Sequence, residues 1–335
     1  MKSKLLTSRV ATAIAITCLA FAATARADTQ DKFTTSFQAT PGGQLTVEVD
    51  RGYIEIKTTD RQSVDIEVRR KARGSKTESG KTLKDHVVTI NQDGNKIEVR
   101  AEYQGAKSLD WLRSSPQLVV SYQITIPQKF NVDLKTAGGS VKVDDLTGTV
   151  QVASSGGSLN FKKIEGSLSG HTSGGGITVA GCKGNVELKT SGGGLQLGEI
   201  EGDVDARTSG GSIRADKLTG KSFLKSSGGG IHVSEIKGQI EALTSGGSIT
   251  ASLIAQPSGD CTFKTSGGGI TVALDAKASV DLDAHTSGGR VSSDLPVTSI
   301  VLGGKNKNEL QGKINGGGPL ITAHTSGGSV SLKRN

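Results

Sequence analysis

Four basic residues recur at equivalent positions of a repeated segment and could together bind an anionic ligand. Each stands three residues before a Gly-Gly pair, and the four are Lys189, Arg207, Lys225 and Lys264. A row of spaced cations is the pattern expected for a linear site that binds an anionic polymer such as an acidic glycan. The alternative is a solvated face that neutralises its own charge, because Glu187 and Asp205 stand two residues before two of these cations.

The sequence contains no motif typical of catalysis or of metal binding. It lacks Cys-x-x-Cys, His-x-x-x-His, a phosphate-binding glycine loop and a serine in a nucleophile elbow. His171, His285 and His324 share one outward position of the repeat, but we expect them in well-separated coils and so expect no metal triad. Nothing resembles the acidic or basic cluster of a pectin-cleaving β-helix enzyme. We therefore expect a protein that is not an enzyme and has no cofactor.

The elements that position these residues follow from a repeat of 18 residues. Seven Gly-Gly pairs begin at this interval, and looser copies follow with pairs at Gly267, Gly288 and Gly327. A short fixed period indicates a solenoid, with the last copy as its terminal coil. We expect corners of the coils, where glycine tolerates positive φ, at the pair-opening residues Gly156, Gly174, Gly192, Gly210, Gly228 and Gly246.

Apolar residues within each copy alternate with a period of two, which is the pattern of a strand with one buried face. Equivalent positions hold equivalent residues, as in Ile177, Leu195 and Ile213. The predicted fold is all-β: a single-chain parallel β-helix or β-solenoid with 18-residue coils, preferably right-handed, preceded by irregular β coils. Ser or Thr precedes nearly every glycine pair, either to satisfy the backbone of the corner or to form a hydroxyl array that binds ice or sugar.

The chain begins with features of a secretory signal peptide over residues 1–27. Basic residues precede an apolar stretch at 10–23, and Ala25-Arg26-Ala27 has the small-x-small pattern of a cleavage site. No later apolar stretch is long enough to span a membrane. We therefore expect export to the periplasm, to the cell surface or out of the cell, with a mature chain that has no transmembrane segment.

We expect one continuous domain after the signal peptide. Residues 28–135 contain alternating runs without the tight repeat, and we interpret them as an irregular β region that caps the solenoid of residues 136–335. Asp93-Gly94 separates two of these runs and predicts a hairpin turn. Both remaining cysteines, Cys182 and Cys261, occupy apolar positions of distant coils, so we expect buried free thiols instead of a disulfide.

The composition argues against a nucleic-acid partner. Cleavage would remove Lys2, Lys4, Arg9 and Arg26, which lowers the net charge from +8 to +4. Aromatic residues make up 3% of the chain, so stacking platforms for bases are scarce.

Three segments resemble the bacterial putative-adhesin family of unknown function, whose members are exported β-solenoids. They are the repeated T-S-G-G-x-I-x-V coils, VSYQITIPQKFNVDLKTAGGSVKV at 120–143 and INGGGPLITAHTSGGSVSL at 314–332. The resemblance extends from Phe33 to Leu332 and implies attachment to a surface, but the family has no shared catalytic or ligand-binding residues to carry over.

These observations favour a non-enzymatic, exported, adhesin-like protein that presents a rigid solenoid surface to a surface, a glycan or a protein of the cell envelope. Two alternatives remain open. One is a glycan-cleaving β-helix enzyme, and the other is a structural or stress-related envelope component whose partner is another protein.

Overall fold

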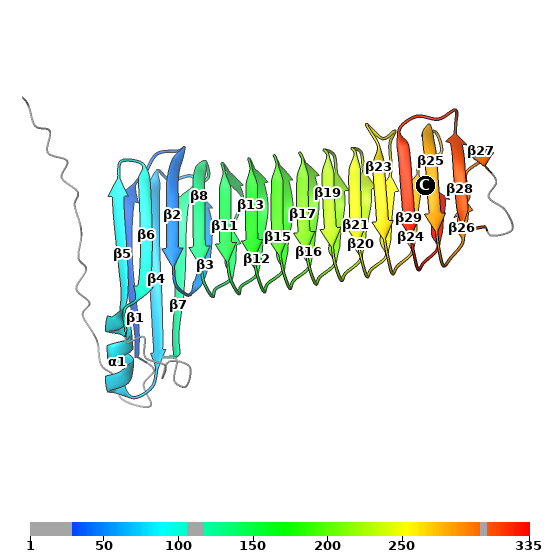
Figure 1. Cartoon of the computed structure of the whole chain (residues 1–335). Coiled ribbons are helices and arrows are strands. Elements are labelled where there is room, and N and C mark those ends of the chain that lie inside the picture. The colour runs from blue at the N-terminus through cyan, green and yellow to red at the C-terminus, as the bar shows by residue number, and fades with distance from the viewer. Residues whose placement is uncertain (1–28, 106–116, 302–306) are drawn as a thin grey trace, which may run out of the picture. The chain divides into compact units, whose positions relative to one another are not determined.

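The computed structural model of the chain contains two compact units, divided between Ala137 and Gly138. It describes residues 29–105, 117–301 and 307–335 (Figure 1). The expected signal peptide lies outside the described residues. Within these ranges, no helix combines the length and the apolar character needed to cross a membrane.

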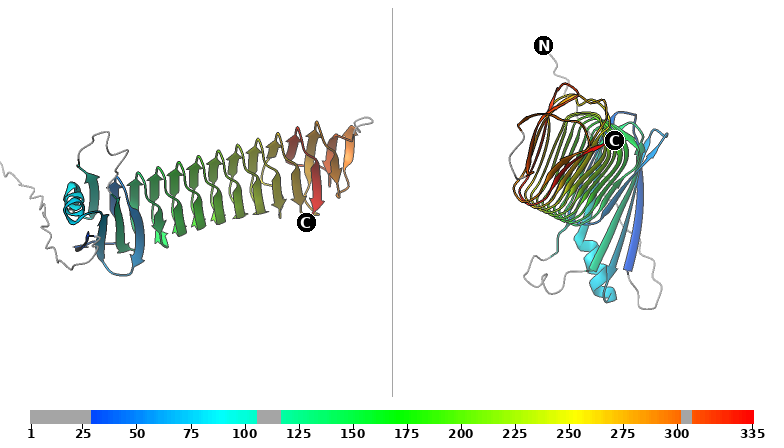
Figure 2. Two further views of the ribbon diagram at one scale, coloured as in Figure 1. Left: turned by 90° about the horizontal axis from the view of Figure 1, so that it is seen from below. Right: turned by 90° about the vertical axis from the view of Figure 1, so that its right-hand side faces the viewer.

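The second unit, Gly138–Asn335, is a stack of β coils, which Figure 1 shows from the side and Figure 2 shows end-on. Its strands are β9 (Val141–Val143), β10 (Leu146–Thr147), β11 (Val150–Ser154), β12 (Leu159–Glu165), β13 (Leu168–Thr172), β14 (Ile177–Lys183), β15 (Val186–Thr190), β16 (Leu195–Glu201), β17 (Val204–Thr208), β18 (Ile213–Leu218), β19 (Ser222–Ser226), β20 (Ile231–Ile236), β21 (Ile240–Thr244), β22 (Ile249–Leu253), β23 (Cys261–Thr265), β24 (Ile270–Leu274), β25 (Val280–Thr286), β26 (Val291–Ser293), β27 (Thr298–Val301), β28 (Glu309–Ile314), β29 (Leu320–Thr325) and β30 (Val330–Arg334).

The strands of this unit form two sheets, because the chain alternates between them once per coil. Sheet A has the order β9-β12-β14-β16-β18-β20-β22-β24-β30-β26, with β10 beside β12. Sheet B has the order β11-β13-β15-β17-β19-β21-β23-β29-β25-β28-β27. Neighbouring strands are parallel up to β25 and β26, and equivalent positions of consecutive coils lie opposite each other, as in Ile177↔Leu195↔Ile213. The predicted β-solenoid with its 18-residue coils is therefore confirmed.

The core lies between the two sheets and consists of the alternating apolar positions. Ile177, Leu195 and Ile213 of sheet A are completely buried, as are Leu188 and Ala206 of sheet B. The two cysteines belong to this core and are free thiols, as predicted. Burial raises the pKa of the Cys182 thiol to about 11.

A row of buried hydroxyl groups connects each coil to the one before it. Thr208 is 5% exposed; its Oγ1 donates a hydrogen bond to the carbonyl oxygen of Gly193 in the previous coil at 2.7 Å and accepts one from the amide of Gly211 at 3.2 Å. The same donation to a glycine carbonyl recurs at Ser154, Thr172, Thr190, Ser226, Thr244, Thr265, Thr286 and Thr325. This column satisfies the backbone of the corner and is closed to a ligand, so the hydroxyl-array interpretation is wrong for it.

The paired glycines lie at the corners, but the reason expected for them is wrong. In the pairs of the repeat, from Gly138 to Gly328, neither glycine has a positive φ among the described residues. The second glycine is instead required by the close approach of consecutive coils, since a Cβ on Gly211 would lie 2.2 Å from the carbonyl oxygen of Gly193. Positive φ occurs at the opposite corner, for example 145° at Gly184 and 152° at Gly202.

The last copy of the repeat does not form the terminal coil. Strand β29 lies between β23 and β25, and β30 lies between β24 and β26 (Figure 1). The coil of β25 and β26 is therefore farther along the stack than the coil that follows it in sequence. Antiparallel strands β28 and β27 complete this end of sheet B.

In its described residues, the first unit contains strands of both directions and one helix: β1 (Thr29–Gln38), β2 (Gly43–Val49), β3 (Tyr53–Thr59), β4 (Ser63–Arg73), α1 (Lys76–Asp85), β5 (His86–Asp93), β6 (Lys96–Tyr103), β7 (Gln117–Pro127) and β8 (Phe130–Thr136). The parallel pairs β3–β7 and β2–β8 resemble coils. β1, β4 and β7 pair antiparallel, unlike the expected coils, because these long strands contain no glycine pair to turn a corner. The predicted hairpin is confirmed, since Asp93 and Lys96 face each other across β5 and β6.

We expect Gly211→Ala to destabilise the solenoid by roughly 1–3 kcal/mol, because the new methyl group would overlap the backbone of the previous coil. Chemical denaturation of the purified protein measures this loss. Gly156→Ala is the matched control, since a Cβ there would come no nearer than 4.0 Å to the Cα of Gly138. Equal midpoints for the two variants would contradict the steric explanation.

Thr208→Val tests the buried hydroxyl row, because valine keeps the shape of the side chain and removes both hydrogen bonds. We expect a loss of about 1–3 kcal/mol in the free energy of unfolding. Ser209→Ala changes the exposed neighbour and serves as the control. If both variants unfold at the denaturant concentration of the parent protein, the hydroxyl row does not contribute to stability.

Candidate functional site

The predicted basic stripe lies on the outer face of sheet B. Lys189, Arg207 and Lys225 occupy directly opposed positions of β15, β17 and β19. Leu243 of β21 follows and separates them from Lys264 of β23. The four cations therefore share one column, with an apolar residue interrupting it.

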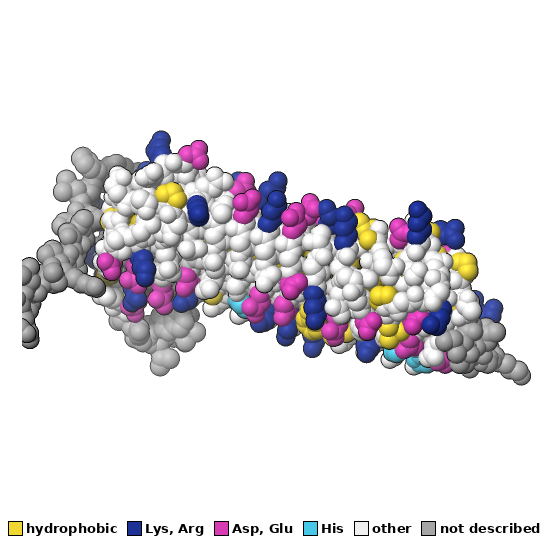
Figure 3. All heavy atoms as spheres, turned by 90° about the horizontal axis from the view of Figure 1, so that it is seen from above, with side chains coloured by type: hydrophobic (Ala, Val, Ile, Leu, Met, Phe, Trp, Pro, Cys, Tyr) yellow, Lys and Arg dark blue, Asp and Glu magenta, His cyan; other side chains and the backbone are white. Residues whose placement is uncertain are grey.

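Acidic neighbours neutralise two of the four cations. The Nζ of Lys189 is paired with Glu187, and this hydrogen bond holds the pKa of the Glu187 carboxyl below its usual value. Arg207 makes a bidentate pair with Asp205, in which Nε and Nη2 each donate a hydrogen bond of 2.6 Å. Basic and acidic side chains are likewise interspersed along the coils in the view of Figure 3.

The other two cations, Lys225 and Lys264, are exposed to solvent. Among the described residues, no carboxylate lies within ion-pair distance of either of them. The column thus contains two compensated cations followed by two uncompensated ones.

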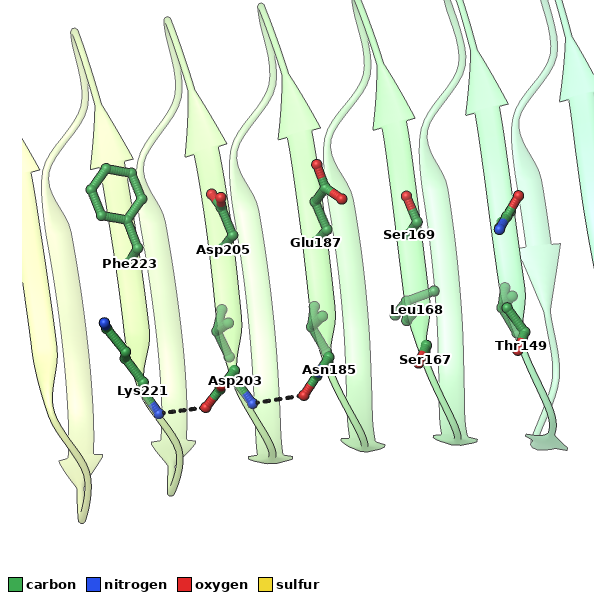
Figure 4. A pocket seen from close by; sticks show the side chains of 14 residues that line it. Thr149, Ser167, Leu168, Ser169, Asn185, Glu187, Asp203, Asp205, Lys221 and Phe223 are labelled. Carbon is green, nitrogen blue, oxygen red and sulfur yellow. Dashed lines mark hydrogen bonds between the residues drawn. The ribbon is translucent and has the colours of Figure 1, made fainter.

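Beside the stripe, a shallow trough of about 490 Å³ crosses five strands of sheet B, from β11 to β19 (Figure 4). Two rows of side chains line it, each row with one residue per coil. The row nearest the stripe contains Gln151, Ser169, Glu187, Asp205 and Phe223, and the second row contains Thr149, Ser167, Asn185, Asp203 and Lys221. Strand pairing places the members of the first row opposite one another. The second row directly precedes the strands, and the backbone carbonyls of its last four residues accept hydrogen bonds from the first strand residue of the previous coil.

Hydrogen bonds between coils fix part of the second row. The side-chain oxygen of Asp203 accepts a hydrogen bond of 2.9 Å from the backbone amide of Lys221, and Asn185 accepts one of 3.3 Å from the amide of Asp203 (Figure 4). These side chains therefore lie along the axis of the stack, where they need little reorganisation to meet a ligand.

The charges of the trough balance. Its three carboxylates are Glu187, Asp203 and Asp205, and three cations, Lys189, Arg207 and Lys221, lie beside or within it. At one end the guanidinium carbon of Arg207 lies 4.7 Å from the ring centroid of Phe223, which holds the ring in place. The trough thus offers amide, hydroxyl and carboxylate groups together with an aromatic ring, and no net charge.

Sequence reasoning missed this trough and Phe223. In the row nearest the stripe only Glu187 and Asp205 are of one kind, and the sequence accounts for them as partners of the basic stripe, so the row as a whole shows no recurring residue type. The signal that could have found it is the shared outward position of Gln151, Ser169 and Phe223, once the coils are aligned.

The structure corrects the expected separation of the histidines. His285 and His324 are directly opposed on β25 and β29, with ring centroids 6.0 Å apart, because the last coil is inserted before the coil of β25. His324 Nε2 lies 2.9 Å from Asp283 Oδ2. His171 lies far along the stack, on β13. Over residues 29–105, 117–301 and 307–335, no three His, Cys, Asp or Glu side chains are grouped as metal ligands.

Comparisons with solved structures give only weak likenesses. A protein described as a "putative adhesin" from Parabacteroides merdae is 12% identical to this chain. The alignment covers 91% of this chain and 96% of that chain, with a TM-score of 0.38. A protein with the same description from Bacteroides fragilis is 13% identical, with coverage of 91% and 97% and a TM-score of 0.32. A "putative lipid binding protein" from Parabacteroides distasonis is 13% identical, with the same coverage and a TM-score of 0.34. None of these likenesses establishes a shared function.

No curated protein matches the chain. The family model described as Toastrack DUF4097, in contrast, matches residues 43–333, which include most of the first unit and nearly all of the second. This match agrees with the resemblance to bacterial adhesin-like β-solenoids. The chain belongs to the Toastrack DUF4097 family.

Proposed function

We propose that this chain is a non-enzymatic, adhesin-like binding protein whose trough on sheet B holds a neutral glycan. The observation that carries the proposal is the trough itself, in which two rows of hydrogen-bonding side chains continue through five coils and meet an aromatic ring. Planar polar side chains bind sugar hydroxyls, and an aromatic ring packs against the apolar face of a sugar. The balanced charge favours a neutral ligand over an ionic one.

The trough suits an extended ligand. Strands of a sheet are about 4.8 Å apart, so five strands extend over roughly 19 Å, the length of a short oligosaccharide. The ligand would lie along the axis of the stack, across the strands. One row belongs to paired strands and the other is hydrogen-bonded between coils at the start of these strands, so the binding groups are already in place before the ligand arrives.

The state of the carboxylates argues against the glycan-cleaving alternative. A glycosidase needs one carboxylic acid with a raised pKa that protonates the leaving group, and a second carboxylate that acts as nucleophile or base. The hydrogen bond from Lys189 lowers the pKa of Glu187 instead, so that this group stays ionised. Both oxygens of Asp205 accept hydrogen bonds from the guanidinium of Arg207, so they already have partners within the protein.

Export to the cell envelope is part of the proposal. It rests on the signal-peptide pattern of residues 1–27 and on the family resemblance. The partner would be a glycan of the cell's own envelope or of a surface to which the cell attaches.

The mature chain should bind neutral oligosaccharides such as chitohexaose or cellohexaose, and calorimetry in low and high salt would measure the affinity. We expect little dependence on salt, because the interaction involves no net charge. Phe223→Ala should weaken binding by up to about tenfold, the value of an aromatic contact. His232→Ala, which removes an exposed ring from the outer face of sheet A, should have no effect. Equal binding by both variants, or no binding of any neutral oligosaccharide, would refute the trough as the site.

A second candidate function is capture of an acidic polymer by the basic stripe, which the unpaired Lys225 and Lys264 favour. Heparin is a suitable probe, and its binding should weaken steeply as salt is added. Replacing both lysines by Glu should abolish it, whereas the control pair Lys163→Glu and Lys237→Glu changes the net charge equally on exposed residues outside the stripe. If the two double variants lose affinity to the same extent, the attraction is non-specific and the stripe is not a site.

A further inference from the structure

The final coil is inserted between two coils that precede it in the sequence. β29 pairs with β23 on one side and with β25 on the other, and β30 pairs with β24 and β26 (Figure 1). Residues 275–279 join β24 to β25 and so pass across the layer that the final coil occupies. Before the final coil is in place, a slot one layer thick must therefore separate the coil of β23 and β24 from the coil of β25 and β26.

Both walls of this slot are strand edges, and the final coil meets them with the contacts found throughout the stack. Thr325 donates a hydrogen bond of 2.7 Å to the carbonyl of Gly268, and Thr286 donates one of 2.6 Å to the carbonyl of Gly328. Ile321 and Val330 are completely buried in the core. Unpaired strand edges bind any strand of suitable pattern. The final coil of a second molecule would fit the slot as well as the molecule's own.

A glycine-rich turn of residues 315–319 joins β28 to the final coil and can serve as a hinge. Three successive residues have left-handed φ values: 49° at Asn315, 91° at Gly316 and 90° at Gly317. A Cβ on Gly317 would also lie 2.4 Å from Asp281 Oδ1. The closed turn is thus accessible only because of glycine, and a change at Gly317 disfavours it without altering the final coil.

We propose that the final coil, Leu320–Arg334, exchanges between two copies of this chain, so that each copy fills the slot of the other. Exchange of an identical element adds no new kind of contact, which makes it an inexpensive route to a dimer. This inference goes beyond the proposed function and does not depend on it. If both hold, the dimer carries two troughs, and linked sites bind a multivalent surface more tightly than single ones.

The hinge variant Gly317→Val tests the exchange. Valine at this φ is strained in the closed turn, and opening the turn in both chains relieves that strain. We expect the dimer-to-monomer equilibrium constant to rise on the order of a hundredfold, tenfold for each turn. Light scattering during size-exclusion chromatography measures it after refolding at high concentration. Gly42→Val is the matched control, because Gly42 has a φ of 86° and a Cβ added to it would meet no neighbour within 4 Å, but it lies in the first unit.

A cysteine pair distinguishes exchange from any other dimer. Ile321 of β29 is directly opposite the native Cys261 of β23, so Ile321→Cys places two thiols side by side. Tagged and untagged copies of this variant, with the native hinge or with Gly317→Val, are unfolded together, refolded and oxidised. Disulfides that join tagged to untagged chains in the dimer support the proposal.

Two results would overturn it: monomers with only internal disulfides in both hinge backgrounds, or dimers whose disulfides are all internal. Should Gly317→Val fail to fold, the native-hinge copies still decide between intermolecular and internal pairing.

Discussion

The close approach of consecutive coils at the Gly-Gly corner is the constraint on which the rest of the structure depends. Gly193 and Gly211 lie so near each other that a side chain on the second would overlap the carbonyl of the first. The Thr208 hydroxyl then completes the contact by joining that carbonyl to the Gly211 amide. A buried polar group without a partner is costly, so this corner requires glycine and a hydroxyl residue together. The inward apolar positions of the regular coils repeat at the same 18-residue interval as this contact.

Much of the fold can be predicted from the sequence because the inward positions repeat. The alternation at Ile177, Val179 and their equivalents identifies strands, and the 18-residue interval identifies the coils and their register. The place of the last coil could not be predicted, because its T-S-G-G pattern is the same as that of the other copies and fits equally well between any two of them. The antiparallel strands of the first unit were missed for the opposite reason, since they have no repeat.

The candidate site was only half predictable. The cations of the stripe recur by type, and the acidic partners of Lys189 and Arg207 stand two residues away, so their neutralisation could be anticipated. The trough depends on outward positions that hold a different residue in each coil. Their relation becomes visible only when the strands are paired. A substitution at an outward position changes the stability of the fold little. The residue found there therefore reflects interactions with solvent or ligand more than the demands of stability.

The antiparallel strands β28 and β27 at one end of sheet B have a consequence for assembly. A parallel stack can in principle lengthen without limit, because each added layer presents the same backbone pattern as the last. Strand β28 reverses that pattern, and the outermost strand β27 has only four residues and an irregular register with β28. On the other sheet β26 offers only the three residues Val291–Ser293. A further parallel layer finds no continuous template there. Growth into fibrils from this end is therefore disfavoured by short and irregular edge strands on both sheets.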